Sequence, residues 1–108
     1  MAEHKSQRVE ISGENFPALR AFLRGYFHED MAEEYDSPED AAQQFCEDAD
    51  SEERTAVAAD WKRFIEQTKG KPLDATNSLL TRKLGSAIKL SDEQVSQVSA
   101  VFARCLRR

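Results

Sequence analysis

Residues 16–27 read FPALRAFLRGYF, and this stretch carries the strongest fold signal in the chain. Its apolar side chains recur every three or four positions, which is the period of an α-helix with one buried face. Pro17 suits the first turn of such a helix, because a proline there leaves no N–H without a partner. The stretch therefore predicts an amphipathic helix whose core side consists of Phe16, Leu19, Phe22, Leu23, Tyr26 and Phe27.

The same period predicts further helices downstream, with recognisable start and stop residues. Ser37-Pro38-Glu39-Asp40 supplies a capping serine, a proline and two acids, so a second helix begins there. Asp50 or Ser51 opens a longer third helix, which Gly70 and Pro72 end. The side chains expected to be buried are Ala41, Ala42, Phe45, Cys46 and Ala49 in the second helix and Val57, Ala58, Trp61, Phe64 and Ile65 in the third.

Two more helices complete the chain. Leucines between residues 73 and 84 mark the fourth helix, with Asp74 or Thr76 as its cap and Gly85 as its end. Ser91-Asp92-Glu93-Gln94 forms a capping box that opens the fifth. The side chains expected to be buried are Leu73, Leu80 and Leu84 in the fourth helix and Val95, Val98, Phe102, Cys105 and Leu106 in the fifth.

These signals define a fold class. No alternating run of strand length competes with the helices, and no repeat or Gly/Ser-rich linker divides the chain. With 108 residues, of which 40% are hydrophobic, the chain can bury one modest core. We therefore expect an all-α, compact single-domain bundle of about five helices over residues 15–108. Residues 1–14 are expected to form a leader that is flexible or includes a short strand at residues 8–11.

Charge is distributed unevenly along the chain. Residues 29–53, called the acidic segment below, hold twelve Asp or Glu and no Lys or Arg, whereas residues 54–108 hold eleven Lys or Arg against five Asp or Glu. Like charges grouped on one surface repel one another and destabilise the folded chain. A cationic partner would relieve this repulsion. The alternative is a solvated surface that only keeps the protein soluble. Direct binding to nucleic acid or to an anionic membrane is not expected, because the acidic segment would repel both.

Motifs for catalysis, metal binding and cofactor binding are missing from the sequence. His28 has carboxylates beside it and could act as a general acid or base, but a histidine at a helix end is more often structural. Residues 48–52 resemble the start of a calcium loop, yet Glu53 stands where glycine is required and Ala59 where the last carboxylate is required. We assign no catalytic residue, no metal ligand and no cofactor.

The cysteines and the N-terminus bear on location. Cys46 and Cys105 have neither a CxxC spacing nor a histidine nearby. The first ten residues lack the basic and then apolar order of a secretory signal, and no apolar run is long enough to span a membrane. We therefore expect a cytoplasmic protein whose two cysteines stay reduced and pack as small apolar residues.

Taken alone, the residues favour a binding protein over an enzyme. Carboxylates grouped on a small helical scaffold resemble the phosphates that a cationic nucleic-acid enzyme binds. They also speed association, because opposite charges attract the two proteins toward each other. A nuclease-type domain is therefore the natural partner. The alternative is a helical adaptor that binds a partner peptide through apolar contacts, with its acids only solubilising it; salt-insensitive binding would favour this alternative.

Two stretches also resemble a known family. Residues 15–30 and 34–41 read NFPALRAFLRGYFHED and EYDSPEDA, and they are similar to bacterial contact-dependent growth inhibition immunity proteins. The shared pattern is F-P-x-L-x-x-F-x-x-x-Y-x-H-x-D, then a short loop and S-P-E-x-A. It covers roughly the first half of the chain. The departures are small, since the family is expected to favour Gln at Glu29 and an aromatic residue at Met31.

The resemblance implies a non-catalytic antidote in the bacterial cytoplasm. Such proteins are encoded beside a large surface-displayed toxin, and they bind and neutralise its C-terminal domain, often a nuclease, which we expect to occur 1:1. His28 and Asp30 are expected to bridge the first helix to the loop before Ser37. The residues expected to hold the scaffold are Phe16, Pro17, Leu19, Phe22, Tyr26, His28, Asp30 and Trp61. The residues expected to contact the toxin are Glu33, Glu34, Tyr35, Asp36, Glu39, Asp40, Glu47, Asp48, Asp50, Glu52 and Glu53.

Overall fold

Helices form all of the regular secondary structure between residues 10 and 106, the part of the chain that the computed structural model describes. In chain order they are α1 (Pro17–Tyr26), α2 (Met31–Glu34), α3 (Pro38–Asp48), α4 (Ser51–Thr68), α5 (Leu73–Ser78), the π-helical turn η2 (Leu79–Lys83) and α6 (Asp92–Cys105). The prediction of an all-α bundle is confirmed. Most of the leader, with residues 8 and 9 of the expected strand, lies outside the described residues.

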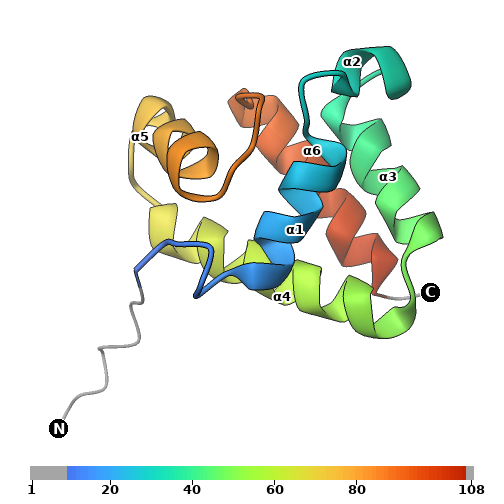
Figure 1. The fold of residues 1–108 in the computed structure, drawn as a ribbon. Helices are drawn as coiled ribbons and strands as arrows, with labels where there is room; N and C mark the ends of the chain where they lie inside the picture. The colour runs from blue at the N-terminus through green and yellow to red at the C-terminus, as the bar shows by residue number, and fades with distance from the viewer. Residues whose placement is uncertain (1–9, 107–108) are drawn as a thin grey trace, which may run out of the picture.

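The helices pack around α1, which lies in the middle of the bundle (Figure 1). α4 runs along one side of α1, and α3 packs most extensively on α6. Phe22 of α1 joins these layers, because its ring lies 5.0–5.5 Å from the ring centres of Tyr26, Phe27, Phe45 and Phe102. Aromatic pairs at such distances add to the stabilisation that burial alone provides.

Most of the predicted helix ends are confirmed. The side chains of Ser37 and Asp50 accept hydrogen bonds from backbone N–H groups in the first turns of α3 and α4, at 3.1 and 2.8 Å. Ser91 opens α6 with a complete capping box. Gly70 and Gly85 follow α4 and η2 with φ of +85° and +91°, a backbone conformation in which other residues would be strained.

The cap predicted for the fourth helix is wrong. α5 begins at Leu73, so Pro72 is its N-cap and Asp74 and Thr76 lie inside the helix. Proline has a φ suited to this boundary, although it offers no capping side chain. Within α5, both polar atoms of the Asn77 side chain bind the backbone of Leu90 at 2.8 Å, which holds the loop before α6 against the bundle.

The N-terminus of α1 has a cap that comes from another helix. Its N-cap residue, Phe16, makes no capping hydrogen bond. Instead, Asp60 of α4 accepts hydrogen bonds from the backbone N–H groups of Ala18 and Leu19, both at 3.1 Å. Arg63 pairs with Asp60 at 2.9 Å and lies 4.4 Å from the centre of the Phe16 ring. A buried carboxylate is thereby fully partnered, and α1 is fixed on α4.

The cysteine prediction is also wrong, because Cys46 and Cys105 form a disulfide between α3 and α6. The two residues are 59 positions apart, so no local spacing could reveal the pair. The close packing of α3 on α6 brings their Cα atoms to 5.8 Å, which is within the normal range for a disulfide.

The buried stripes follow the predictions with a few exceptions. Leu106 was expected in the core, but its side chain is 52% exposed, because it lies at the rim of a groove between α4 and α6. Tyr26, Leu73, Ile65 and Val95 are only partly buried. α2 was not predicted, since four residues are too few to show a helical period.

Candidate functional site

The acidic segment is divided into two groups by the fold. α3 has 11 residues and is about 16 Å long, so acids at its two ends are well separated. The α2–α3 acids lie on α2, in the loop after it and in the first turn of α3; they are Glu33, Glu34, Asp36, Glu39 and Asp40. The corner acids lie where α3 gives way to α4; they are Glu47, Asp48, Asp50, Glu52 and Glu53. All ten are exposed except Glu39, which is half-buried.

A chain of side-chain contacts runs between the two groups. The imidazole of His28 lies 3.2 Å from the Glu34 carboxylate, so it joins the end of α1 to α2. The Tyr26 ring stacks on that of Tyr35 at 5.9 Å, and the Tyr26 hydroxyl donates to Asp48 at 2.9 Å. These contacts tie Glu34 of the first group and Asp48 of the second to the C-terminal end of α1.

The α3–α4 corner is fixed by its own hydrogen bonds. Asp50 caps α4, as described above, and Gln44 donates to Asp48 at 2.9 Å. Arg54 donates to the carbonyl oxygens of Ala49 and Cys46, at 2.7 and 3.3 Å, where the end of α3 leaves carbonyl groups without helical partners. The guanidinium is thus directed at the backbone of α3, and the corner acids keep a defined geometry.

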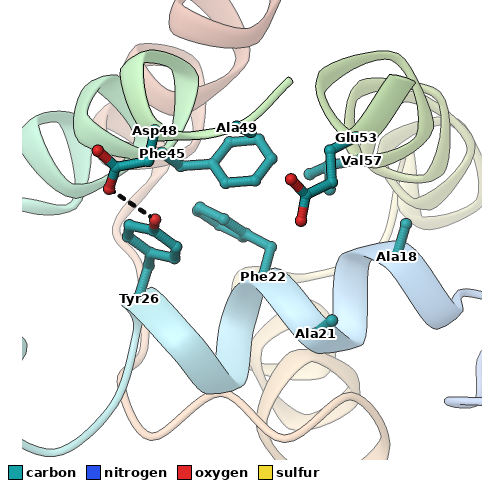
Figure 2. Close-up of a pocket in the computed structure, with 9 residues that line it drawn as sticks. All are labelled: Ala18, Ala21, Phe22, Tyr26, Phe45, Asp48, Ala49, Glu53 and Val57. Carbon is teal, nitrogen blue, oxygen red and sulfur yellow. Dashed lines mark hydrogen bonds between the residues drawn. The ribbon is translucent and has the colours of Figure 1, made fainter. Parts of the chain in front are cut away.

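A cavity of about 200 Å³, called the corner pocket below, opens between α1 and this corner (Figure 2). Its floor and walls are mainly apolar, and its polar groups are the Tyr26 hydroxyl and two carboxylates. Figure 2 shows the Glu53 carboxylate pointing into the opening, whereas that of Asp48 is held at the edge by Tyr26. The lining residues are Ala18, Ala21, Phe22, Tyr26, Phe45, Asp48, Ala49, Glu53 and Val57.

The pocket carboxylates act on the tyrosine beside them. Partial burial, the hydrogen bond to Asp48 and the negative charges of Asp48 and Glu53 together raise the pKa of Tyr26 to about 12. The pKa of Tyr35 is raised as well, first by burial and then by the charges of Glu34 and Asp48. The Tyr26 phenol is therefore a neutral hydrogen-bond donor to Asp48 at neutral pH.

A second hollow, the α4–α6 groove, lies on another side of α4. Its volume is about 500 Å³, and it combines apolar side chains with one cation and one anion. The exposed Leu106 lies at its edge. Its lining residues are Ala58, Trp61, Lys62, Ile65, Glu66, Ser99, Phe102, Ala103 and Leu106.

The residues expected to hold the scaffold occupy different environments. Phe16, Leu19, Phe22 and Trp61 are buried, and the Trp61 ring N–H donates to Ser99 at 2.8 Å. Pro17 begins α1 and is exposed. Of the expected bridge, His28 reaches Glu34, whereas Asp30 takes part through its backbone N–H, which donates to the His28 ring at 3.1 Å.

Two features of this region are not predicted by the sequence. Val57 and Ala49 match the pattern of core residues, yet both line the corner pocket. Asp60 caps α1 through backbone groups more than forty positions away, which no local pattern predicts. An acid within an apolar helix stripe, beside Trp61, was the available signal for Asp60, because a buried carboxylate needs partners.

The described residues offer little for catalysis or metal binding. Within residues 10–106 no group of three or more His, Cys, Asp or Glu side chains is arranged to hold a metal ion. His28, the only histidine in this part of the chain, contacts Glu34 and is not paired with a nucleophile. Over the same residues, no helix is long and apolar enough to cross a bilayer.

A comparison with models of protein families identifies a family for this chain. A family model described as CdiI immunity protein matches residues 15–96, which is well over half of the chain. The matched region begins just before α1 and ends within the first half of α6. Searches of curated proteins and of solved structures found no match to the chain.

Proposed function

The chain belongs to the CdiI immunity protein family, whose function is to neutralise a cognate toxin protein, and we propose that it does so by covering a basic surface of a nuclease toxin with its acidic segment. The C-terminal domain of the toxin is the proposed partner, in a 1:1 complex. Binding, rather than catalysis, is then the whole activity of this chain.

The observation that carries this proposal is the charge of the segment together with its position. Twelve acids occur between residues 29 and 53 without a single Lys or Arg. α3 and α4, which hold most of the α2–α3 acids and the corner acids, begin with side-chain caps at Ser37 and Asp50. A fixed array of carboxylates costs less side-chain ordering on binding than a flexible one, so more of the interaction energy is available for affinity.

The proposed mechanism is occlusion of the substrate-binding surface. A nuclease holds its substrate through Lys and Arg side chains that contact phosphates. The carboxylates would pair with those side chains, and Tyr35, which is half-buried beside Tyr26, would add an aromatic contact. Opposite charges also steer the two proteins together, which matters for an antidote that must act before the toxin does damage.

Charge reversal tests this proposal. Glu47→Lys with Glu52→Lys changes two exposed corner acids that have no capping role, so the fold should be retained. We expect affinity for the toxin domain encoded beside this chain to fall by roughly tenfold or more at low salt, mainly through slower association. Protection against nucleic-acid cleavage in vitro, and against growth arrest in cells, should fall in parallel.

The matched control reverses two exposed acids outside the acidic segment. Glu14→Lys with Asp74→Lys makes the same change in net charge and touches neither the corner pocket nor the α4–α6 groove. If both pairs of substitutions weaken binding equally, overall charge is responsible and the acidic segment has no special role. If neither pair affects binding, the electrostatic mechanism is refuted, and the α4–α6 groove becomes the preferred contact, as in the adaptor alternative.

A further inference from the structure

The corner pocket has the size of one side chain. Its volume of about 200 Å³ lies below the roughly 300–1,000 Å³ of sites that take small organic ligands. It opens on the same surface as the corner acids, between α1 and the α3–α4 corner (Figure 2). A protruding side chain of a protein bound to those acids would be the natural occupant.

Charge in and around the pocket favours a cation. None of its nine lining residues is Lys or Arg, and two are carboxylates. The cations of α1 are turned elsewhere, since Arg20 lies against Gly13 and Arg24 against Gly85. Arg54 is engaged with carbonyl groups of α3. The negative charge of the pocket is therefore not neutralised by these neighbouring cations.

The two carboxylates of the pocket differ in the number of hydrogen bonds that they already accept. Asp48 accepts hydrogen bonds from Tyr26 and Gln44, one at each oxygen. The Glu53 carboxylate makes no hydrogen bond or ion pair with any residue between 10 and 106, although it points into the opening (Figure 2). Its charge contributes to the raised pKa of Tyr26, so the carboxylate acts on the pocket interior. Glu53 is thus the group with free acceptor capacity.

We propose that the corner pocket receives one arginine side chain of the toxin, whose guanidinium pairs with Glu53 beside Asp48 and whose stem lies along the rings of Phe22 and Phe45. Arginine fits better than lysine, because a planar guanidinium can bind a carboxylate through two N–H groups, whereas an ammonium is a compact point charge. This inference rests on the proposed function, since it names the chemistry of the partner at one part of the acidic segment.

Two pairs of matched variants test the pocket in calorimetric titrations with the toxin domain. Glu53→Gln keeps the side-chain shape and removes the charge, and Glu52→Gln makes the same change one residue away, outside the lining. Ala21→Phe fills the corner pocket, and Ala103→Phe makes the same substitution in the α4–α6 groove. Both alanines are exposed, so the bulkier side chain should be accommodated.

We expect Glu53→Gln and Ala21→Phe each to raise the dissociation constant by roughly tenfold to a hundredfold. Ala103→Phe should change it by less than about threefold, and Glu52→Gln, which removes an acid of the same surface outside the pocket, should have a clearly smaller effect than Glu53→Gln. Equal effects of Glu53→Gln and Glu52→Gln, with none from Ala21→Phe, would overturn the pocket while leaving the acidic segment as the binding surface. Thermal melts of all four variants check that the fold is retained.

A small probe tests the pocket without the toxin. N-acetyl-arginine amide should shift the backbone amide signals of Ala21 and Ala49 in nitrogen-15 NMR spectra, and Glu53→Gln should abolish these shifts. N-acetyl-norleucine amide, which lacks the guanidinium, should leave the signals unchanged. If the wild-type chain fails to bind the toxin, the proposed function fails, whereas an absent or charge-independent response to the arginine probe refutes the pocket itself.

Discussion

The corner pocket and the α4–α6 groove are both walled by α4, yet they differ in charge. The corner pocket uses the first half of α4, and its two carboxylates have no cation in the lining. The groove uses the second half, where Lys62 and Glu66 balance each other around a larger apolar surface. One helix thus contributes to a site suited to a cation and to a hollow without a charge preference. The affinity of a partner bound at the corner pocket should therefore fall as salt rises, whereas the affinity of a partner bound in the groove should not.

The largest expected effect comes from the aromatic cluster that supports both hollows. Phe22 lines the corner pocket, and its ring contacts Phe102, which lines the groove. Phe22→Ala should lower the free energy of unfolding by roughly 4 kcal/mol, because it leaves a cavity among packed rings. Urea denaturation measures this. A loss below about 1 kcal/mol would mean that the two hollows do not depend on a common core.

The disulfide should have the next largest effect, because it ties α3, a wall of the pocket, to α6, a wall of the groove. Cys46→Ala with Cys105→Ala should lower the free energy of unfolding by roughly 3 kcal/mol. Reductant should destabilise the wild-type chain and leave this variant unaffected. Coincident unfolding curves of the wild-type chain with and without reductant would contradict the prediction.

Asp60 should matter for the pocket more than for the groove, since it fixes α1 on α4. Asp60→Ala leaves two backbone N–H groups and Arg63 without their partner, and we expect a loss of roughly 2 kcal/mol. Asp74→Ala, which changes an exposed acid in the first turn of α5, is the control and should cost less than about 0.5 kcal/mol. Equal losses of stability in Asp60→Ala and Asp74→Ala would contradict the capping role of Asp60.

The smallest effect is a dependence on alkaline pH at the edge of the pocket. The pKa of Tyr26 is about 12 in the folded chain and 10.0 when unperturbed. Because the folded pKa is the higher one, the stabilisation from the neutral phenol is complete below pH 10 and is lost as pH rises through about 12. Absorbance at about 295 nm follows phenolate formation. Tyr26→Phe should remove the transition near pH 12 and leave that of Tyr35; the absence of a wild-type transition near pH 12 would contradict the prediction.

Local signals in the sequence predicted the helices well. The caps at Ser37, Asp50 and Ser91 depend on residues within one turn, so they could be recognised without knowing the fold. The apolar stripes likewise predicted most of the core, because burial follows helical period. Leu106 was an exception, since a period cannot tell whether another helix covers the last turn.

Contacts between distant residues could not be predicted in the same way. The disulfide, the Asp60 cap and the corner pocket each bring together side chains from helices that are far apart in sequence. The acidic segment was visible as a composition, but its division into two groups depends on the length and placement of α3. The position of α1 against the α3–α4 corner then determines which acid points into a cavity.

The most direct measurement is a calorimetric titration of this chain into the toxin domain encoded beside it, at low and at high salt, while nucleic-acid cleavage is followed in the same mixtures. The account predicts a 1:1 complex that abolishes cleavage and whose affinity falls steadily as salt rises. Tight binding that is independent of salt would contradict the electrostatic mechanism. An absence of binding at both salt concentrations would contradict the proposed partner.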